Sequence, residues 1–342
     1  METLIIRTGN HQSQVLLGES YNQVEKYLPD ARVIAVTDKN VYEHYRAFIR
    51  QWPVIVIKPG ERNKTFETLE YIIDKLIRLN ADRSTFVLGI GGGIVCDITG
   101  FAASIYMRGL RFGFISTSLL SQVDASVGGK NGINFRGYKN MVGVFRQPDF
   151  VLCDPSMLKT LDNHEFITGF AEVIKAAAIR DESFFSWLEA NYKAALNHDP
   201  EALEQMIYRS VKIKAEVVEL DEKERNLRRI LNFGHTFGHA LEKVTGISHG
   251  EAVSVGMVMA AKLSEKTGTA PAGTALRLQQ LLSGVGLPLL SPVPPDDLVD
   301  AMSRDKKKEK EQMFLVLLRR IGEAVTMPMP YTELKQHLHD LR

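Results

Sequence analysis

The sequence predicts an α/β N-terminal domain with a parallel sheet, followed by a mainly α-helical C-terminal domain. Short apolar strands alternate with helical segments in the first half, whereas helical patterns dominate from about Asp154 onward. A chain of 342 residues also has the length of about two domains, at roughly 150 residues each. We therefore expect one domain over residues 1–155 and a second over residues 156–342.

The strands of the first domain are expected where β-branched apolar residues form short runs. Residues 32–37 and 54–57 are such runs, typical of strands covered on both faces. Residues 66–77 instead repeat apolar side chains every three or four positions, which predicts a helix. Residues 85–90 form another buried strand and lead directly into Gly91–Gly93. This order of strand, helix, strand and glycine turn predicts a parallel sheet.

Helical periodicity characterises the second half of the chain. We expect helices over residues 165–180, 182–196, 200–220, 235–245 and 251–266. The proline-rich residues 291–295 predict an extended connection between helices, and the mixed charges of residues 304–311 are typical of a solvated helix face.

Charge and hydropathy limit the possible partners. The 42 Lys and Arg against 41 Asp and Glu leave a net charge of +1, with no global attraction to nucleic acid or an anionic membrane. The most apolar stretch, between Arg83 and Arg108, contains five glycines and Asp97 and makes a poor membrane span. The N-terminus shows no signal peptide pattern, and Cys96 and Cys153 are predicted to be buried thiols. We expect a soluble cytoplasmic protein that binds neither nucleic acid nor membrane.

The glycine turn at residues 91–93 is the first candidate for chemistry. Glycines between a strand and a helix let backbone amides approach a phosphate, and the helix N-terminus adds positive potential. The alternative is that these glycines serve close packing of the strand against the helix. Asp38, at the end of an earlier strand, could hold a nucleotide ribose or could simply begin a helix.

A second candidate is the segment of residues 124–140, which is rich in glycine, lysine and asparagine. Ammonium groups, amides and backbone N–H donors could converge there on one anion. The Gly129-Lys130 pair is not followed by Ser or Thr, so the segment is not a Walker motif. Two adjacent turns with solvated lysines remain the alternative.

Histidines provide the strongest local signal. His235, His239 and His249 are three of only nine histidines and fall within fifteen positions. Together with a carboxylate from elsewhere, they offer ligands for Zn²⁺. His235 and His239 lie four positions apart, on one face of a helix, which favours them as the ligand pair. The sequence alone does not decide which of the three histidines bind the metal.

A carboxylate and a lysine interrupt the apolar helix around residues 169–178. Burying Glu172 or Lys175 without a partner would be costly, so each requires a metal, a partner or a binding site. An internal ion pair between the two is the alternative.

Taken together, these motifs resemble the 3-dehydroquinate synthase family, which belongs to the sugar phosphate cyclases. The resemblance spans nearly the whole chain and rests on Gly91-Gly92-Gly93 with Asp97, Tyr106-x-Arg108-Gly109, residues 123–130, 172–175, 231–239 and 249–253, and Asp305-Lys306-Lys307. It implies a Rossmann-like NAD-binding α/β domain, a helical metal-binding domain and a homodimer.

The resemblance also implies roles for individual residues. The metal, normally Zn²⁺ with Co²⁺ as an alternative, would be held by Glu172, His235 and His249, and His239 would face the substrate phosphate instead. NAD would be bound by Asp38, Glu61, Lys64, Gly91, Gly92, Gly93, Asp97, Thr117, Ser118, Lys130 and Lys139. The substrate would contact Arg108 (reaching from the partner subunit), Asp124, Lys130, Asn140, Lys175, Lys214, Arg228, Asn232, His239, Lys306 and Lys307.

The implied reaction converts 3-deoxy-D-arabino-heptulosonate 7-phosphate into 3-dehydroquinate and phosphate, a step of the shikimate pathway that leads to aromatic amino acids. It combines transient oxidation of the C5 hydroxyl by NAD, phosphate elimination, re-reduction and an intramolecular aldol closure. The sequence departs from the family pattern at Ser116, Asn131 and Tyr138, which bears on the sugar phosphate recognised. The retained Arg228 and Asn232 favour the heptulosonate.

Three alternative functions are open at the level of sequence. One is another sugar phosphate cyclase, which would make an inosose or a valiolone ring. A second is a metal-dependent polyol dehydrogenase, which needs NAD and metal but no phosphate cradle. A third is a binding protein that has lost catalysis.

Overall fold

The computed structural model describes the whole chain except residues 10, 295–296, 299–301, 303–311 and 339–342. It forms two compact units, of which the first comprises Met1–Asp162 with Lys214–Glu222. The second comprises Asn163–Ile213 with Lys223–Arg342. The sequence prediction placed a single boundary at 155/156. The charged run of residues 304–311, including Lys306 and Lys307, lies outside the described residues.

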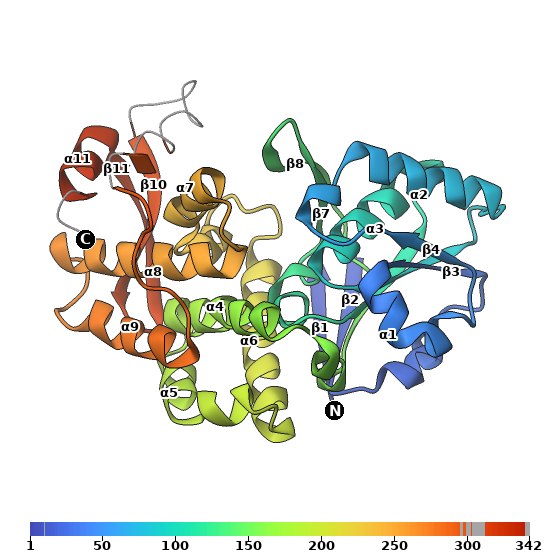
Figure 1. Cartoon of the computed structure of the whole chain (residues 1–342), viewed down its shortest axis with the longest axis horizontal. Coiled ribbons are helices and arrows are strands. Elements are labelled where there is room, and N and C mark those ends of the chain that lie inside the picture. The colour runs from blue at the N-terminus through green and yellow to red at the C-terminus, as the bar shows by residue number, and fades with distance from the viewer. Residues whose placement is uncertain (10, 295–296, 299–301, 303–311, 339–342) are drawn as a thin grey trace. The chain divides into compact units, whose positions relative to one another are not determined.

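The first unit is built on a seven-stranded sheet with the order β1-β2-β9-β6-β5-β3-β4 (Figure 1). The strands are β1 (Glu2–Thr8), β2 (His11–Leu17), β3 (Val33–Asp38), β4 (Val54–Ile57), β5 (Phe86–Gly91), β6 (Arg111–Ser116) and β9 (Phe150–Cys153). All neighbours pair in parallel except β1 and β2. The main helices are α1 (Lys39–Ile49), α2 (Phe66–Arg78) and α3 (Gly93–Ile105). The predicted α/β fold class with a parallel sheet is thereby confirmed.

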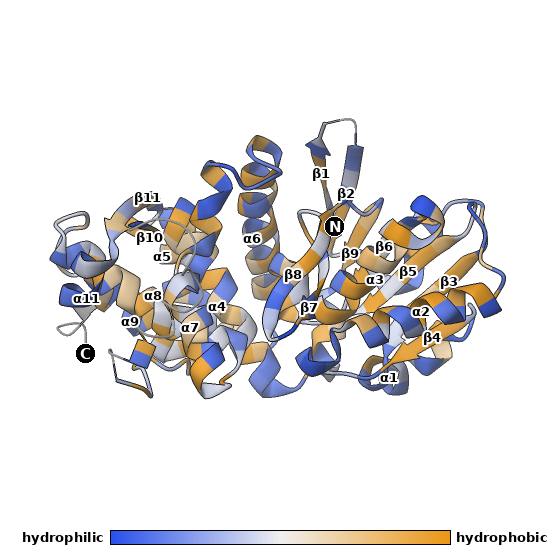
Figure 2. Ribbon diagram, turned by 90° about the horizontal axis from the view of Figure 1, so that it is seen from above, coloured by the Kyte–Doolittle hydropathy of each residue, from blue (hydrophilic) through white to orange (hydrophobic). Residues whose placement is uncertain are grey.

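The sheet is held together by strands that are apolar on both faces. Every residue of β5 is buried, and Phe86, Leu88 and Ile90 belong to one core cluster with residues of β2, β3, β6 and β9. Strands β3, β4 and β9 are mainly hydrophobic along their length (Figure 2). Cys96 and Cys153 are free thiols buried in this unit, as predicted.

The strand order creates one position where successive connections leave in opposite directions. From β3 the chain passes to β4 on one side, and it then returns to β5 on the other side of β3 and continues to β6. In parallel sheets, ligands bind beyond the carboxyl ends of the strands at such a switch point. Here those ends are Asp38 of β3 and Gly91 of β5.

A separate antiparallel hairpin, β7 (Lys130–Phe135) and β8 (Tyr138–Phe145), packs on α3. The buried Asn131 contacts α3 at Gly100, where a Cβ atom would lie 1.9 Å from the Asn131 Oδ1 atom. Its amide nitrogen donates to the carbonyls of Gly129 at 3.0 Å and Arg146 at 2.8 Å. The asparagine at this departure from the family pattern therefore serves to join the ends of the hairpin.

The second unit is mainly helical, with an added β-hairpin. Its helices include α4 (Asn163–Arg180), α5 (Glu182–Leu196), α6 (Pro200–Leu220), α7 (His235–Thr245), α8 (His249–Lys266), α9 (Thr274–Val285) and α11 (Tyr331–Leu338). The last turns of α6, from Lys214 onward, belong to the first unit. The hairpin β10 (Gln312–Arg320) and β11 (Glu323–Pro330) was not predicted, and it packs against α8. Within the described residues, no helix has the length and apolarity needed to cross a bilayer.

Helices α7 and α8 approach each other closely because of a glycine. A Cβ atom at Gly256 in α8 would lie 2.0 Å from the carbonyl oxygen of Gly234 and 2.9 Å from the backbone nitrogen of Gly238. Both obstacles are backbone atoms, so no side-chain rotation could relieve the overlap. Any residue other than glycine would force the two helices apart.

We expect Gly256→Ala to lower the free energy of unfolding by about 1–3 kcal/mol, the usual cost of overpacking. Urea unfolding followed by circular dichroism measures this change. Lys266→Ala, at an exposed position of the same helix, is the control and should change the free energy by less than about 0.5 kcal/mol. An unchanged unfolding midpoint for Gly256→Ala would contradict the packing argument.

Candidate active site

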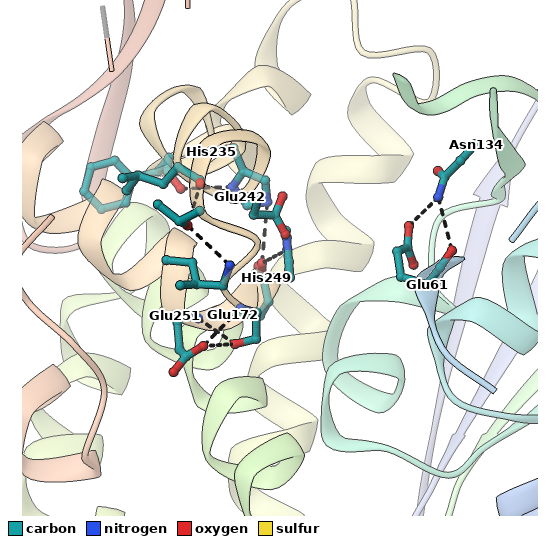
Figure 3. A network of polar contacts seen from close by, with 12 residues as sticks. Glu61, Asn134, Glu172, His235, Glu242, His249 and Glu251 are labelled. Atoms are coloured by element: carbon teal, nitrogen blue, oxygen red, sulfur yellow. Dashed lines mark hydrogen bonds and ion pairs between the residues drawn. The ribbon is translucent and has the colours of Figure 1, made fainter. Parts of the chain in front are cut away.

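Three side chains from three helices of the second unit converge on one point. Glu172 lies on α4, His235 begins α7 and His249 begins α8, and their ligand atoms all lie within 4.8 Å of one another (Figure 3). The Oε1 atom of Glu172 is 3.1 Å from His249 Nε2 and 3.5 Å from His235 Nε2. We refer to these three residues as the Glu–His cluster.

Local backbone features place His249 in the cluster. Ser248 caps α8 in a capping box with Glu251, whose Oε2 atom accepts a hydrogen bond from the Ser248 backbone nitrogen at 3.0 Å. Gly250, which follows His249 in the chain, lies against α4. A Cβ atom at Gly250 would be 2.1 Å from the Thr168 carbonyl oxygen. The start of α8 can therefore lie close to the turn of α4 that carries Glu172.

In both His235 and His249 the Nδ1 atom lies next to an acceptor oxygen, while the Nε2 atom faces Glu172. Nδ1 of His235 is 3.2 Å from the Phe233 carbonyl oxygen, and Nδ1 of His249 is 3.2 Å from Glu242 Oε1. With a metal bound, a proton kept on Nδ1 would satisfy either acceptor and leave Nε2 as the ligand atom. In tetrahedral zinc sites with bonds of 2.0–2.1 Å, ligand atoms lie about 3.4 Å apart. The spacings of 3.1 Å and 3.5 Å fit such an ion.

Burial and charge set the protonation of the cluster. Only 1% of the Glu172 side chain is exposed, and the ammonium group of Lys175 forms an ion pair with its Oε2 atom. Burial opposes ionisation of Glu172, but Lys175 and the two imidazoles outweigh it and hold its pKa well below the ordinary value. Burial lowers the pKa of His235 to about 3. Although burial acts in the same direction on His249, hydrogen bonds to Glu172 and Glu242 raise its pKa to about 9.

His239 occupies a different position from the other two histidines. It is exposed, and its ring centroid lies 5.3 Å from that of His235 and 6.4 Å from that of His249. The ligand atoms of His239 can converge with those of Glu242 and His249, but among the described residues no such group contains both His235 and His239. Spacing along α7 alone therefore does not bring these two rings to one ion.

Two further polar residues of the second unit that the sequence singled out are Arg228 and Asn232. Arg228 is only 1% exposed, an unusual state for a guanidinium. The side-chain amide of Asn232 donates to Glu224 Oε1 at 2.5 Å. Glu224, which sequence reasoning missed, has a positive φ of 55°. Its place in a short charged segment gave no periodic signal by which to find it.

The glycine turn of the first unit lies at the switch point of the sheet. Gly92 is the N-cap of α3 and has no side chain to accept a hydrogen bond from the start of the helix. The backbone amides of that first turn can therefore donate to a bound anion. Asp38 begins α1 and accepts a hydrogen bond from the Val41 nitrogen at 3.0 Å, in agreement with the helix-capping alternative. Thr117 is buried nearby, and the Ser118 hydroxyl would lie 3.1 Å from a Cβ atom at Gly92.

A polar network in the same unit joins several predicted residues. Lys64, which is 3% exposed, forms an ion pair with Asp97 and donates to Asn140 Oδ1 at 2.6 Å. Burial raises the pKa of Asp97, although Lys64 acts against it. Asn134 donates to Glu61 Oε1 at 2.8 Å (Figure 3) and accepts from the Asn140 nitrogen at 2.9 Å. Asn134 lies in the glycine-, lysine- and asparagine-rich segment that the sequence singled out, although no individual role was predicted for it.

The remaining predicted residues are more dispersed. Lys214 donates to the Asp124 carboxylate at 2.5 Å, which brings two residues far apart in sequence together. Lys130 and Lys139 are exposed on the β7–β8 hairpin. Arg108 is exposed in the turn after α3 and has a φ of 70°. Lys306 and Lys307 cannot be placed because they lie outside the described residues.

The fold and the site define a class of protein that is also found among solved structures. A 2-deoxy-scyllo-inosose synthase, crystallised with carbaglucose-6-phosphate, NAD⁺ and Co²⁺, is 26% identical, with a TM-score of 0.88 over 99% of this chain and 100% of its own. A 2-epi-5-epi-valiolone synthase from Streptomyces hygroscopicus with NAD⁺ and Zn²⁺ is 28% identical, with a TM-score of 0.89 over 100% and 99%. This is the fold of the sugar phosphate cyclases. Several alcohol and glycerol dehydrogenases, at 12–16% identity, share the fold alone.

The particular family follows from sequence. Residues 54–168 match the family model for the 3-dehydroquinate synthase N-terminal part, and residues 169–308 match the model for its C-terminal part. A curated relative from Acinetobacter baylyi, a 3-dehydroquinate synthase, is 41% identical over 95% of this chain and 94% of its own. The chain belongs to the 3-dehydroquinate synthase family and is an enzyme of that type.

The geometry predicts different roles for His235 and His239, and metal binding by two variants tests this. We expect His235→Ala to lose bound Zn²⁺ because it removes one of three converging ligands, whereas His239→Ala should retain about one ion per chain. Metal analysis of the purified, dialysed variants measures both. His337→Ala, on helix α11 and outside the Glu–His cluster, controls for nonspecific binding. Loss of metal from both variants at positions 235 and 239 would instead support the helix-spaced pair.

Proposed function

We propose that this chain converts 3-deoxy-D-arabino-heptulosonate 7-phosphate into 3-dehydroquinate and phosphate. The Glu–His cluster carries the proposal, because its ligand spacing suits Zn²⁺ and it occurs in a chain that is 41% identical to a 3-dehydroquinate synthase. The reaction is a carbon–oxygen lyase step with no net redox change. It belongs to the shikimate pathway.

Two cofactors, NAD and Zn²⁺ or Co²⁺, would supply the redox and Lewis-acid chemistry: a hydride is removed from C5 and returned, and the C5 hydroxyl is acidified. The relatives with NAD⁺ and Zn²⁺ or Co²⁺ support this choice. Glu172, His235 and His249 would hold the metal. The backbone of the Gly91–Gly93 turn would hold the NAD phosphates, with the other contacts from Asp38, Glu61, Lys64, Asp97, Thr117, Ser118, Lys130 and Lys139.

The substrate carries a phosphate and a carboxylate, so its recognition requires fixed cations and amide donors. We assign this recognition to Arg108, Lys130, Asn140, Lys175, Lys214, Arg228, Asn232, His239, Lys306 and Lys307, with Asp124 as a further substrate contact. Arg228 is of particular interest among these, because its guanidinium is 1% exposed and a charged group interacts more strongly with an anion where water is excluded. Its planar fork can bind a carboxylate through two parallel hydrogen bonds.

A cyclase for another sugar phosphate is the nearest alternative. The inosose and valiolone synthases share the whole fold at 26% and 28% identity. The departure at Asn131 does not favour them, because this side chain is buried and binds backbone carbonyls of the hairpin. Tyr138, by contrast, is 45% exposed in β8. A polyol dehydrogenase is supported by likeness of fold alone.

The substrate assignment predicts phosphate release from the heptulosonate only when both NAD and a divalent metal are present. Release would be followed with a coupled phosphate assay, each cofactor being omitted in turn after chelation. Absorbance at 340 nm should show no net NADH, since the hydride is returned. Turnover of glucose 6-phosphate or sedoheptulose 7-phosphate in place of the heptulosonate would support another cyclase, and NADH accumulation with glycerol would support a dehydrogenase.

We further propose that the enzyme is a cytoplasmic homodimer in which Arg108 contributes to the partner's site. Arg108 and Met107 both have positive φ values, 70° and 49°, and the Met107 side chain is 43% exposed. A strained, exposed turn with an apolar residue supports contact with a second copy.

Complementation between two inactive variants tests this arrangement. Mixed dimers of Arg108→Ala and His235→Ala would contain one site with both native residues only if Arg108 acts across the interface. With random exchange of subunits, about a quarter of wild-type phosphate release should return. An Arg108 that acts within its own subunit predicts no recovery, provided that light scattering confirms dimers and subunit exchange.

A further inference from the structure

We propose that Glu242 is a positioning residue that orients His249 toward a bound metal ion through the Nδ1 atom of its ring. The inference rests on the proposed function, since it presupposes a metal at the Glu–His cluster. Glu242 is not one of that cluster's three ligands. It would act through His249 rather than touch the substrate.

The geometry singles out Glu242 as the partner of His249. Its Oε1 atom lies 3.2 Å from His249 Nδ1, while the opposite nitrogen of the same ring lies 3.1 Å from Glu172 Oε1 (Figure 3). The imidazole therefore bridges two carboxylates. Only 4% of the Glu242 side chain is exposed. A buried carboxylate at this distance accepts the Nδ1–H and leaves Nε2 as the metal-binding atom.

The two histidines of the cluster are oriented by different kinds of acceptor. His235 uses the neutral backbone carbonyl of Phe233, whose position is fixed by the chain itself. His249 uses an ionisable side chain from a neighbouring helix. Hydrogen bonds to a charged acceptor are roughly twice as strong as those to a neutral one. The orientation of His249 thus depends on one side chain that can be changed without altering the backbone.

The position of Glu242 on α7 explains how one helix can serve two ligands. Glu242 follows His235 by seven residues, which places both on the same face of the helix. That face supplies His235 as a ligand and presents Glu242 to the ring of His249 on α8. The close contact of α7 and α8 at Gly256 brings the two helices within reach.

Metal affinity provides the principal test. We expect Glu242→Leu to weaken binding of Zn²⁺ about 10- to 100-fold, the usual effect of losing such a partner. Glu242→Gln retains a carbonyl oxygen as acceptor and should recover part of that loss. The metal-depleted full chain would be titrated with Zn²⁺ against a chromophoric chelator. Glu216→Gln, at an exposed position of α6, is the matched control and should bind Zn²⁺ like the wild type.

A second measurement distinguishes orientation from general destabilisation. The visible spectrum of the Co²⁺-loaded protein reports ligand geometry, and it should change in Glu242→Leu but stay close to wild type in Glu242→Gln. Urea unfolding of the metal-free proteins should show that Glu242→Gln is as stable as the wild type. A loss of affinity that merely follows a loss of stability in both variants would overturn the proposal.

Other outcomes are equally decisive. Zn²⁺ affinities within twofold of the wild type in both variants would overturn the positioning role. A second Zn²⁺ per wild-type chain, lost in Glu242→Gln, would also overturn it by making Glu242 a ligand of the group that contains His239 and His249. Phosphate release by the wild type, assayed in parallel, keeps the two hypotheses apart. Its absence with Zn²⁺ bound would reject the proposed function, and its presence with unaffected variants would reject only the role of Glu242.

Discussion

The second unit depends on how one buried charge, the carboxylate of Glu172, is compensated. Removing an ion from water costs several kcal/mol even after the protein relaxes, so the carboxylate requires cations or donors in fixed positions. Lys175 supplies one from the same helix, and His235 and His249 face the other oxygen from two further helices. The packing of α4, α7 and α8 is therefore tied to electrostatics as well as to apolar contact. A divalent cation at the same point would be held by Glu172, His235 and His249.

Close backbone contact makes this convergence possible. Gly250 lets the first turn of α8 lie against α4, and Gly256 lets its middle lie against the start of α7. Each contact would be lost with a single added methyl group. The glycines therefore act on the site from outside it, by setting how near the three ligand-bearing helices can come. Ser248 and Glu251 then fix where α8 begins, and with it the position of His249.

Much of the fold could be predicted from local patterns, whereas the choice of ligands could not. Apolar runs located β3, β4 and β5, and helical periodicity located α4 to α8 to within a few residues. The β10–β11 hairpin was missed because it follows a charged segment and its apolar run has no strict alternation. Spacing favoured His235 with His239, yet the Glu–His cluster joins three separate helices. Glu242 was missed for the same reason, since in sequence it is simply one carboxylate on a helix.

The chain has almost no net charge, although its proposed substrate is an anion. The two are compatible because several lysines are paired with carboxylates of the same chain. Lys64 is paired with Asp97, Lys214 with Asp124 and Lys175 with Glu172. In each pair the carboxylate holds a buried or nearly buried ammonium in position before any ligand arrives. An anion that contacted any one of these lysines would have to share it with, or displace, the existing partner. It would therefore gain less than the full strength of a new ion pair.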